Sequence, residues 1–212
     1  KKRDAELKAM QAQISPHFLF NTLNAVRWAS INKNNEKAAH MVLALSKLLH
    51  MTIAKGDEMI TLQQEIENLI NYISILKMRH SKAFDMVVDI CDEIKDYKIP
   101  KLLLQPLVEN AIIHGFEDIK SGGIIEVKGW VEGDRVIISV RDNGKGMRQD
   151  DLNQESSLKE LKFSGIGITN VDERIKIYYG EEYGLNIHSI PGEGTDVTVI
   201  LPLHIKEGHK VD

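Results

Sequence analysis

The spacing of the hydrophobic residues changes once along the chain, and this change constrains the fold more than any other feature. In the first third they recur at steps of three and four residues, in runs over residues 7–28, 41–53 and 62–76, which is the period of amphipathic helices. From about Ser81 they fall instead into short runs rich in β-branched residues, beginning with residues 84–90. Such runs are typical of strands. The pattern predicts a helical N-terminal part followed by an α+β part.

Polar breaks divide the N-terminal part into three helices. The breaks lie at residues 32–37 and 55–58, and they predict an antiparallel hairpin of two helices over residues 1–56. A third helix is expected to connect this hairpin to the rest of the chain over residues 57–80. Thr61 and Gln64 have the spacing of a capping box at its start.

Residues 81–212 alternate between predicted strands and helices. We expect one helix to open at Pro100 and run to residue 116, and another to follow Gly165. The expected strands are residues 84–90, the two sides of a turn at Gly133 and Asp134, residues 184–190 and residues 194–203. Adjacent strands joined by hairpins predict a layer of helices on a mostly antiparallel or mixed sheet.

Composition excludes several classes of protein. The 212 residues carry a net charge of −4, which gives no electrostatic case for a nucleic-acid partner. The single cysteine, Cys91, excludes a disulfide framework within the chain and suits a reducing compartment. No apolar run approaches the roughly 20 residues of a membrane helix, so we expect this segment itself to make no membrane contact. The start has no signal-peptide pattern and is already helical, as expected of a piece of a longer protein.

The stretch DNGKGM at residues 142–147 follows a predicted strand. Asp142 places a carboxylate at the strand end, and Gly144 and Gly146 let the backbone approach a ligand without a clash at Cβ. A plain turn uses the same residue types. Taken alone, the stretch leaves a turn and a ligand-binding loop equally open.

Two further glycine pairs follow. Gly165 and Gly167 begin a predicted helix, where outward N–H groups and the helix dipole favour an anion such as a nucleotide phosphate. A flexible loop leading into a helix is the alternative. The second pair precedes Thr195, in a stretch that, taken alone, is best explained as an ordinary hairpin turn.

The stretch PLVENAIIHGF at residues 106–116 places Glu109, Asn110 and His114 on an otherwise apolar helix. Asn110 and His114 are four residues apart and share a face. A buried carboxamide needs partners, and its oxygen is a hard ligand of the kind that Mg²⁺ accepts beside phosphates and water. A core histidine and a helix-capping asparagine are the alternative for this stretch alone.

The order of these motifs resembles the ATP-binding domain shared by histidine kinases, gyrase, Hsp90 and MutL, and no Walker motif occurs. The stretch QISPHFLFNTLN at residues 13–24 resembles the histidine box of the LytS/YehU-type sensor histidine kinases. Residues 61–80 and 102–115 resemble the connector and the asparagine box of the same family. The resemblance covers nearly the whole chain. It implies an α+β fold in which a helical hairpin dimerises into a four-helix bundle and precedes an α/β-sandwich ATP-binding domain.

By this resemblance His17 accepts the phosphoryl group. A neutral imidazole has a free ring nitrogen that can attack the γ-phosphate. Pro16 is expected to bend the helix and turn His17 outward. A solvent-exposed helix histidine is the alternative. Asn21 lies one turn further on. It would either position a water that dephosphorylates the partner response regulator or set the register of the dimer.

The resemblance also implies the roles of the nucleotide-binding residues. Asn110 would hold Mg²⁺, Asp142 would accept from the adenine amino group, and Thr195 would lie near the base. Gly144 and Gly146 would let the backbone pass the nucleotide. Gly165 and Gly167 would shape the end of a lid over the phosphates, and His114 would line the pocket. The lid itself is expected at residues 147–164 and to become ordered with ATP.

Three positions depart from the family pattern. Phe18 stands where many histidine kinases have an acidic residue, and Pro106 stands where many have a second asparagine. Ile113 stands where a lysine or arginine is frequent, so Lys159 or Lys162 is a candidate for the phosphate contact. Glu109 is either an acid/base group or a surface charge.

The predicted function is autophosphorylation on His17 with ATP and Mg²⁺, followed by transfer to an aspartate of a response regulator receiver domain. The expected partners are a second copy of the chain and this regulator, and the expected location is the cytoplasmic side of an inner- or plasma-membrane sensor. The alternatives are a nucleotide-binding dimerisation or sensing module with a degenerate site, and an ATPase of the gyrase or MutL type.

Overall fold

The computed structural model describes residues 16–32, 34–53, 58–79, 83–117, 119, 121–147 and 165–204. The helices and strands in chain order are α2 (Pro16–Ile31), α3 (Asn35–Ile53), β1 (Met59–Thr61), α4 (Leu62–Arg79), β2 (Ala83–Ile90), η1 (Asp92–Ile94), β3 (Lys98–Pro100), α5 (Gln105–Asn110), η2 (Ala111–Gly115), β4 (Ser121–Glu132), β5 (Arg135–Asp142), α8 (Gly165–Tyr179), β6 (Gly184–Ile190) and β7 (Gly194–Pro202). None of the described helices has the length and apolar character that crossing a membrane requires.

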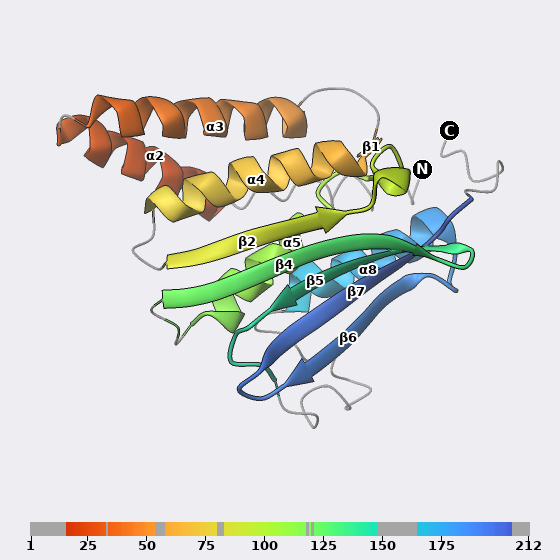
Figure 1. The fold of residues 1–212 in the computed structure, drawn as a ribbon. Helices are drawn as coiled ribbons and strands as arrows, with labels where there is room; N and C mark the ends of the chain where they lie inside the picture. Colours follow the sequence, from red (N-terminus) through yellow and green to blue (C-terminus); the bar gives the residue numbers. More distant parts are fainter. Residues whose placement is uncertain are drawn as a thin grey trace.

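The main sheet has five strands in the order β2-β4-β5-β7-β6 (Figure 1). β2 and β4 run parallel, and the other neighbours are antiparallel. The predicted turn at Gly133 and Asp134 joins β4 to β5, and Gly133 has the positive φ of 61° that such tight turns use. The sequence prediction of a mixed, mostly antiparallel sheet is therefore confirmed.

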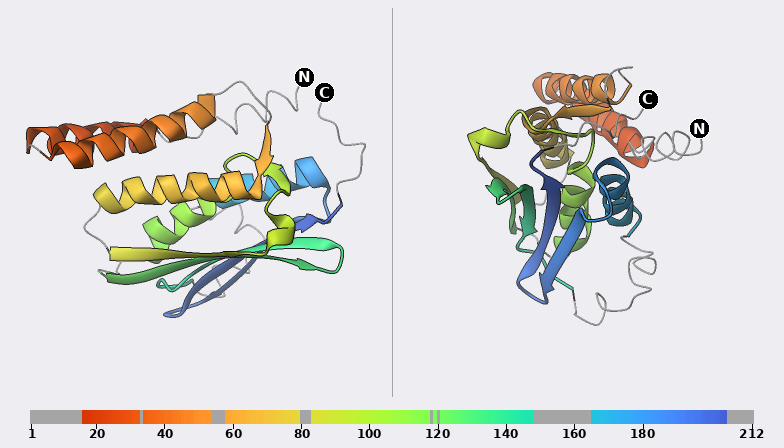
Figure 2. Two further views of the ribbon diagram at one scale, coloured as in Figure 1. Left: turned by 45° about the horizontal axis from the view of Figure 1, so that its top comes forward. Right: turned by 90° about the vertical axis from the view of Figure 1, so that its right-hand side faces the viewer.

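Three helices, α4, α5 and α8, cover one face of this sheet (Figure 2). Burial alternates along β4, so that Ile125 and Val127 face the helices while Ile124 and Trp130 remain partly exposed. The core fills the space between the two layers and includes Leu69, Leu104 and Ile138. This two-layer arrangement confirms the predicted α/β sandwich.

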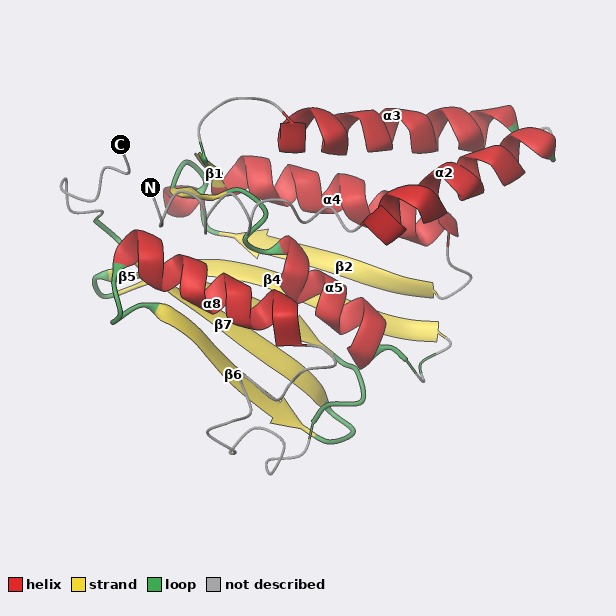
Figure 3. Cartoon of the chain, turned by 180° about the vertical axis from the view of Figure 1, so that it is seen from behind, coloured by secondary structure: helices red, strands yellow, loops and turns green. Residues whose placement is uncertain are grey.

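The N-terminal helices α2 and α3 form the predicted hairpin, and α3 packs on α4 (Figure 3). Buried Ala38, Met41 and Leu45 mark the inner face of α3, and Leu45 belongs to the same hydrophobic cluster as the sandwich core. α4 therefore has the hairpin on one side and the sheet on the other.

The capping box at the start of α4 is confirmed. The N–H of Gln64 donates to Oγ1 of Thr61 at 3.1 Å, and the N–H of Thr61 donates to Oε1 of Gln64 at 2.9 Å. Thr61 also ends β1, which pairs with β3 in a small second sheet. The sequence did not predict this sheet, because strands of three residues are too short to show a period.

The prediction that Pro100 opens a helix is wrong. Pro100 ends β3, residues 101–104 form a turn, and α5 begins only at Gln105. Leu102 has a φ of 57°, which a helix does not allow. The N–H groups of Leu102 and Leu104 donate to the carboxylate of Glu65 on α4. A side chain from a distant helix thus holds this turn.

Candidate functional site

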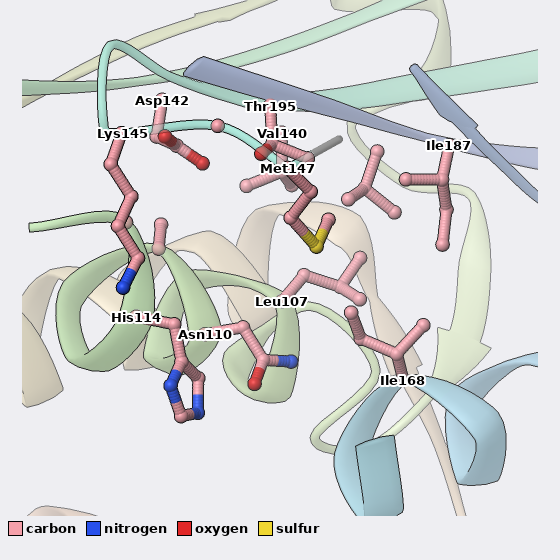
Figure 4. Close-up of a pocket in the computed structure, with 14 residues that line it drawn as sticks. Leu107, Asn110, His114, Val140, Asp142, Lys145, Met147, Ile168, Ile187 and Thr195 are labelled. Carbon is pink, nitrogen blue, oxygen red and sulfur yellow. The ribbon is translucent and has the colours of Figure 1, made fainter. Parts of the chain in front are cut away.

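A pocket of about 650 Å³, partly open to solvent, lies between the sheet and the ends of α5 and α8 (Figure 4). Its apolar lining includes Leu107, Met147, Val140, Ile168, Ile187 and Val197. Its polar lining is Asn110, His114, Asp142, Lys145 and Thr195. This combination of a mostly apolar surface with few polar groups is typical of small-molecule sites.

Asp142 lies at the end of β5 and is 6% exposed. Its Oδ1 accepts the N–H of Gly144 at 2.8 Å. Burial raises the pKa of this carboxyl, and the N–H groups of Gly144 and Thr195 act against the rise. The structure therefore presents a desolvated carboxylate held in place by backbone donors.

The loop after Asp142 is fixed against the end of η2 and the β6–β7 turn. The N–H of Lys145 donates to the carbonyl of Gly115 at 2.9 Å, and the N–H of Gly192 donates to the carbonyl of Lys145 at 2.7 Å. A Cβ on Gly144 would lie 2.5 Å from the Gly115 oxygen, and one on Gly146 would lie 2.0 Å from the Ile190 oxygen. The sequence motif thus has glycine where the backbone packs too closely for a Cβ.

A hydroxyl pair supports the same wall from β6 and β7. The Oγ of Ser189 and the Oγ1 of Thr195 lie 2.9 Å apart, and Ser189 also accepts the N–H of Met147 at 2.8 Å. Ser189 is 3% exposed. Thr195 pairs with Asp142 across the sheet, so the structure brings these two predicted residues together.

Asn110, the last residue of α5, lies across the pocket from Asp142 and Thr195 (Figure 4). Its Nδ2 atom is buried and has no hydrogen-bond partner among the described residues. An unpartnered buried amide is costly. A half-turn of the carboxamide exchanges nitrogen and oxygen, so the same position can present Oδ1 to a cation.

His114 and Lys145 lie near each other at one side of the pocket (Figure 4). Burial and then the positive charge of Lys145 lower the pKa of His114, while Glu117 opposes this shift. The shift favours the neutral form of the imidazole. The predicted helix continues here as a π-helical turn, Ala111–Gly115, and both Asn110 and His114 still line the pocket.

The other residues that the sequence predicts to bind nucleotide lie at the edge of the pocket or behind its lining. Gly165 begins α8, and a Cβ on Gly167 would lie 3.6 Å from Nδ2 of Asn110. Glu109 is not one of the lining residues; its Oε1 accepts the side-chain N–H of Gln105 at 2.9 Å. Gly144 lies behind Asp142, and a Cβ there would come 2.6 Å from Oδ1 of Asp142.

Some predicted residues fall outside the described part of the structure. His17 and Asn21 belong to the backbone of α2, but their side chains are not described. The bend expected at Pro16 lies at the limit of the described residues. The lid residues 148–164, with Lys159 and Lys162, lie outside them as well, so these roles stay predictions.

Sequence reasoning missed several lining residues. Lys145 stands between the two glycines of the 142–147 motif, and its position inside that motif was the available signal. Ile168 and Ile187 come from α8 and β6. They are ordinary core-type residues in the sequence, and only the folded arrangement brings them to the pocket.

The chain matches two known families. Residues 5–84 match the family described as histidine kinase, and residues 95–205 match the family described as histidine kinase-, DNA gyrase B-, and HSP90-like ATPase. The sensor histidine kinase YesM of Bacillus subtilis is 37% identical over 200 residues, which cover 94% of this chain and 34% of that protein. The sensor protein LytS of Bacillus anthracis is 34% identical over 212 residues, which cover 99% of this chain and 36% of that protein. The chain spans about a third of the length of the curated relatives it matches.

Two solved structures share the fold. The Acinetobacter baumannii histidine kinase AdeS has a TM-score of 0.52 at 15% identity and covers 84% of both chains. The catalytic domain of the histidine kinase ThkA has a TM-score of 0.52 at 17% identity and covers 68% of this chain and 93% of that one. The helical hairpin, the sandwich and both family matches agree, and the chain belongs to the sensor histidine kinases, with a C-terminal domain of the histidine kinase-, DNA gyrase B- and HSP90-like ATPase family.

Proposed function

We propose that this chain is a two-component kinase core, which transfers the γ-phosphoryl group of ATP to His17 and then to an aspartate of a response regulator. One observation carries the proposal: the two walls of the pocket differ in their polar groups. Asp142 has backbone donors, whereas the buried Nδ2 of Asn110 has no partner among the described residues. Such a pocket offers a base-reading acceptor on one side and a free ligand-binding group on the other.

The sheet side of the pocket suits adenine. Asp142 accepts a hydrogen bond from the exocyclic amino group, and Thr195 lies beside it. The apolar side chains of Val140, Ile187 and Val197 surround the flat base. Guanine has a carbonyl in place of this amino group, so two acceptors would face each other there.

The helix side of the pocket suits the phosphates and a cation. Bound Mg²⁺ would neutralise charge on the phosphate oxygens. Asn110 fits this role because its carboxamide is buried and its nitrogen lacks a partner in the described part of the chain. Within that part, no group of three or more acidic, histidine or cysteine side chains is placed to hold a metal ion. His114 and Lys145 also line the pocket and can contact phosphate oxygens, for which Lys145 would exchange its ion pair with Glu117.

The reaction is a displacement at phosphorus. An unprotonated ring nitrogen of His17 forms a bond to the γ-phosphorus while the bond from this phosphorus to the β–γ bridging oxygen breaks, and ADP leaves with that electron pair. The proton on the other ring nitrogen passes to solvent. Catalysis of this kind depends mainly on positioning and on charge stabilisation.

The test is incubation with γ-labelled ATP and Mg²⁺. We expect an acid-labile, base-stable label on the unaltered protein and on the control His40→Gln, which changes an exposed histidine of α3. His17→Gln is expected to remove the label but to leave ATP binding nearly unchanged. Retained label in His17→Gln would reject this nucleophile and turn attention to His40, His50 or His80. Binding without label would support a nucleotide-sensing module, and release of phosphate without label would support an ATPase.

We also propose that the chain acts as a homodimer through its hairpin. Apolar side chains of α2 and α3 are strongly exposed, with Leu23 at 50%, Trp28 at 60% and Leu43 at 56%. A monomer rarely leaves so much apolar surface on one element. Trp28→Glu is expected to shift the mass measured by light scattering toward the monomer. Val87→Glu, at a 50% exposed site on the open face of the sheet, is the matched control.

Asn21 is proposed to assist dephosphorylation of the regulator, with a register role in the dimer as the alternative. If the first role holds, Asn21→Ala still dimerises and becomes labelled, but phosphorylated regulator persists longer. A fall in dimer stability that accounts for the whole change would support the register role.

We further propose that the chain is the cytoplasmic segment of a membrane-bound sensor, because the relatives named as sensors are much longer than this chain.

A further inference from the structure

The turn at residues 101–104 connects β3 to α5 and has an unusual backbone. Leu102 has a φ of 57° and is the only non-glycine residue with a positive φ in the part of the chain that the structure describes. This conformation is disfavoured for a branched apolar residue and needs support from its surroundings. The turn leads directly into the short helix that ends at Asn110.

Glu65 supports the turn from α4. Its Oε2 accepts the N–H of Leu102 and its Oε1 accepts the N–H of Leu104, each at 3.0 Å. The side chain belongs to a residue that is only 2% exposed, and burial raises its pKa against the effect of these N–H groups and of Arg174. A buried carboxylate on two backbone donors is a strong and specific contact.

Arg174 supports the same turn from α8. Its guanidinium donates to the carbonyl of Lys101 at 2.7 Å and to that of Leu102 at 3.3 Å, and the residue is 6% exposed. Donors and acceptors of the turn are thus satisfied by two charged side chains from two different helices. We name Glu65, Arg174 and residues 101–104 together the 101–104 clamp.

The helices that follow the clamp lead to the pocket. α5 lies between α4 and α8 (Figure 3), and α8 begins beside Asn110, where a Cβ on Gly167 would come within 3.6 Å of Nδ2. The same Cβ would lie 3.5 Å from the Cβ of Pro106 at the start of α5, so α5 and α8 pack closely here. The end of η2 is bonded to the loop after Asp142, so the clamp and this bond hold α5 at its two ends. A loosened turn would therefore let the start of α5 shift, and Asn110 with it, relative to Asp142 on β5.

We propose that Glu65 and Arg174 are positioning residues that, through the 101–104 clamp, hold Asn110 in place for the cation-bound phosphates of ATP. The proposal rests on the proposed nucleotide-binding function. If the proposal is right, weakening the clamp reduces the affinity for Mg·ATP but does not change the affinity for adenosine, which would contact only the sheet side of the pocket. A residue with a general structural role would affect both affinities alike.

The experiment measures both affinities by calorimetry in the full chain. Glu65→Gln keeps the shape of the side chain but leaves one turn N–H facing an amide nitrogen. Arg174→Lys keeps the charge but loses the planar fork whose two nitrogens each reach one carbonyl. For each we expect the Kd of Mg·ATP to rise by about tenfold and that of adenosine to change less than about twofold. In the double variant, the rise in the Kd of Mg·ATP should be smaller than the product of the two single-variant rises, since both residues act on one turn.

Two control variants separate positioning from stability. Glu67→Gln changes an exposed carboxylate of α4, and we expect no effect on either ligand. Val136→Ala removes buried methyl groups at the end of β5 far from Asp142, and should lower the melting temperature without separating the two affinities. Amide hydrogen exchange of residues 102–110 should become faster in Glu65→Gln and not in Val136→Ala.

The outcomes distinguish the two proposals. Unchanged Mg·ATP affinity in both clamp variants, or equal losses for Mg·ATP and adenosine, would overturn the clamp while the nucleotide-binding function stands. If the unaltered protein binds neither ligand, the proposed function fails and the clamp fails with it. Selective loss of Mg·ATP affinity together with faster exchange in residues 102–110 would support the clamp.

Discussion

The two walls of the pocket are built in opposite ways. On the sheet side, Asp142, Ser189 and Thr195 exchange hydrogen bonds with neighbouring backbone and side chains, and the loop after Asp142 is bonded to two neighbouring turns. On the helix side, Asn110 keeps a buried nitrogen with no partner in the described residues. The polar groups of the sheet wall are hydrogen-bonded without a ligand, whereas the helix wall has a buried amide nitrogen left over. We infer that the first wall supplies specificity and the second supplies the response to nucleotide.

The largest expected effect comes from breaking the sheet wall. Gly146→Ala would place a Cβ 2.0 Å from the Ile190 oxygen at a residue with a φ of 65°. We expect a loss of about 3 kcal/mol in the free energy of unfolding, together with loss of ATP binding. Urea unfolding and calorimetry measure the two quantities.

Gly122→Ala is the matched control for this change. Gly122 also has a positive φ, of 79°, but a Cβ added there would meet no atom within 4 Å. Gly122→Ala should lower the free energy of unfolding by about 1–2 kcal/mol and retain ATP binding. Equal losses for the two variants would mean that backbone strain, and not close packing of the loop, explains the glycine at position 146.

The next variant tests whether Asn110 on the helix wall serves ligand binding and not the stability of the fold. Asn110→Ala should reduce Mg·ATP affinity by about 1–3 kcal/mol but leave the free energy of unfolding nearly unchanged, because the amide nitrogen it removes is unpartnered within the described chain. Titration of Mg²⁺ at fixed ATP should show that the dependence on the cation is weakened. A large loss of stability would instead make Asn110 a structural residue.

Asn143 offers the opposite case. Its Oδ1 accepts the N–H of Ile124 at 2.7 Å and its Nδ2 donates to the Gly122 carbonyl at 3.0 Å. Asn143→Ala should therefore lower stability by about 1–2 kcal/mol while leaving Mg·ATP affinity close to that of the unaltered protein. The pair of variants would show that the same residue type has two different functions within this pocket region.

An effect of similar size on nucleotide affinity tests the specificity of the sheet wall. Asp142→Asn should weaken ATP binding by about 1–3 kcal/mol, while GTP gains relative to ATP because an amide can donate to the guanine carbonyl. Competition between the two nucleotides measures the ratio directly. An unaltered ATP affinity in this variant would make Asp142 a turn residue and remove the proposed adenine contact.

The features that the sequence predicted are encoded locally. The periods of three to four and of two residues indicated the helices and the five strands of the main sheet, and Thr61 with Gln64 indicated the start of α4. The 142–147 motif pointed to the pocket because glycine spacing is itself a local constraint. These patterns need no knowledge of the rest of the fold.

The features that the sequence did not predict depend on distant contacts. The turn after Pro100 exists because Glu65 and Arg174 bind its backbone from two other helices, and nothing near Pro100 in the sequence indicates this. In the sequence Glu65 resembles any other polar residue of an amphipathic helix, yet it is buried. The lining residues Ile168 and Ile187 are likewise indistinguishable from core residues until α8 and β6 are placed.

The smallest effect concerns the ionisation of Asp142. Burial raises its pKa above the ordinary value of 3.8, so the carboxyl takes up a proton at a higher pH than an exposed aspartate does. The protonated group no longer accepts fully from adenine, and adenosine affinity should therefore fall as the pH falls through the raised pKa. The unfolded chain binds this proton less readily, so folding stability should move the other way: it is gained as the pH falls through the window above 3.8 and lost as the pH rises through it. Asp142→Asn lacks this titration, and subtracting its pH profiles of adenosine affinity and of melting temperature isolates the carboxyl. Opposite slopes of the two differences would establish Asp142 as a desolvated acceptor in the pocket, and two flat differences would show that it does not titrate there.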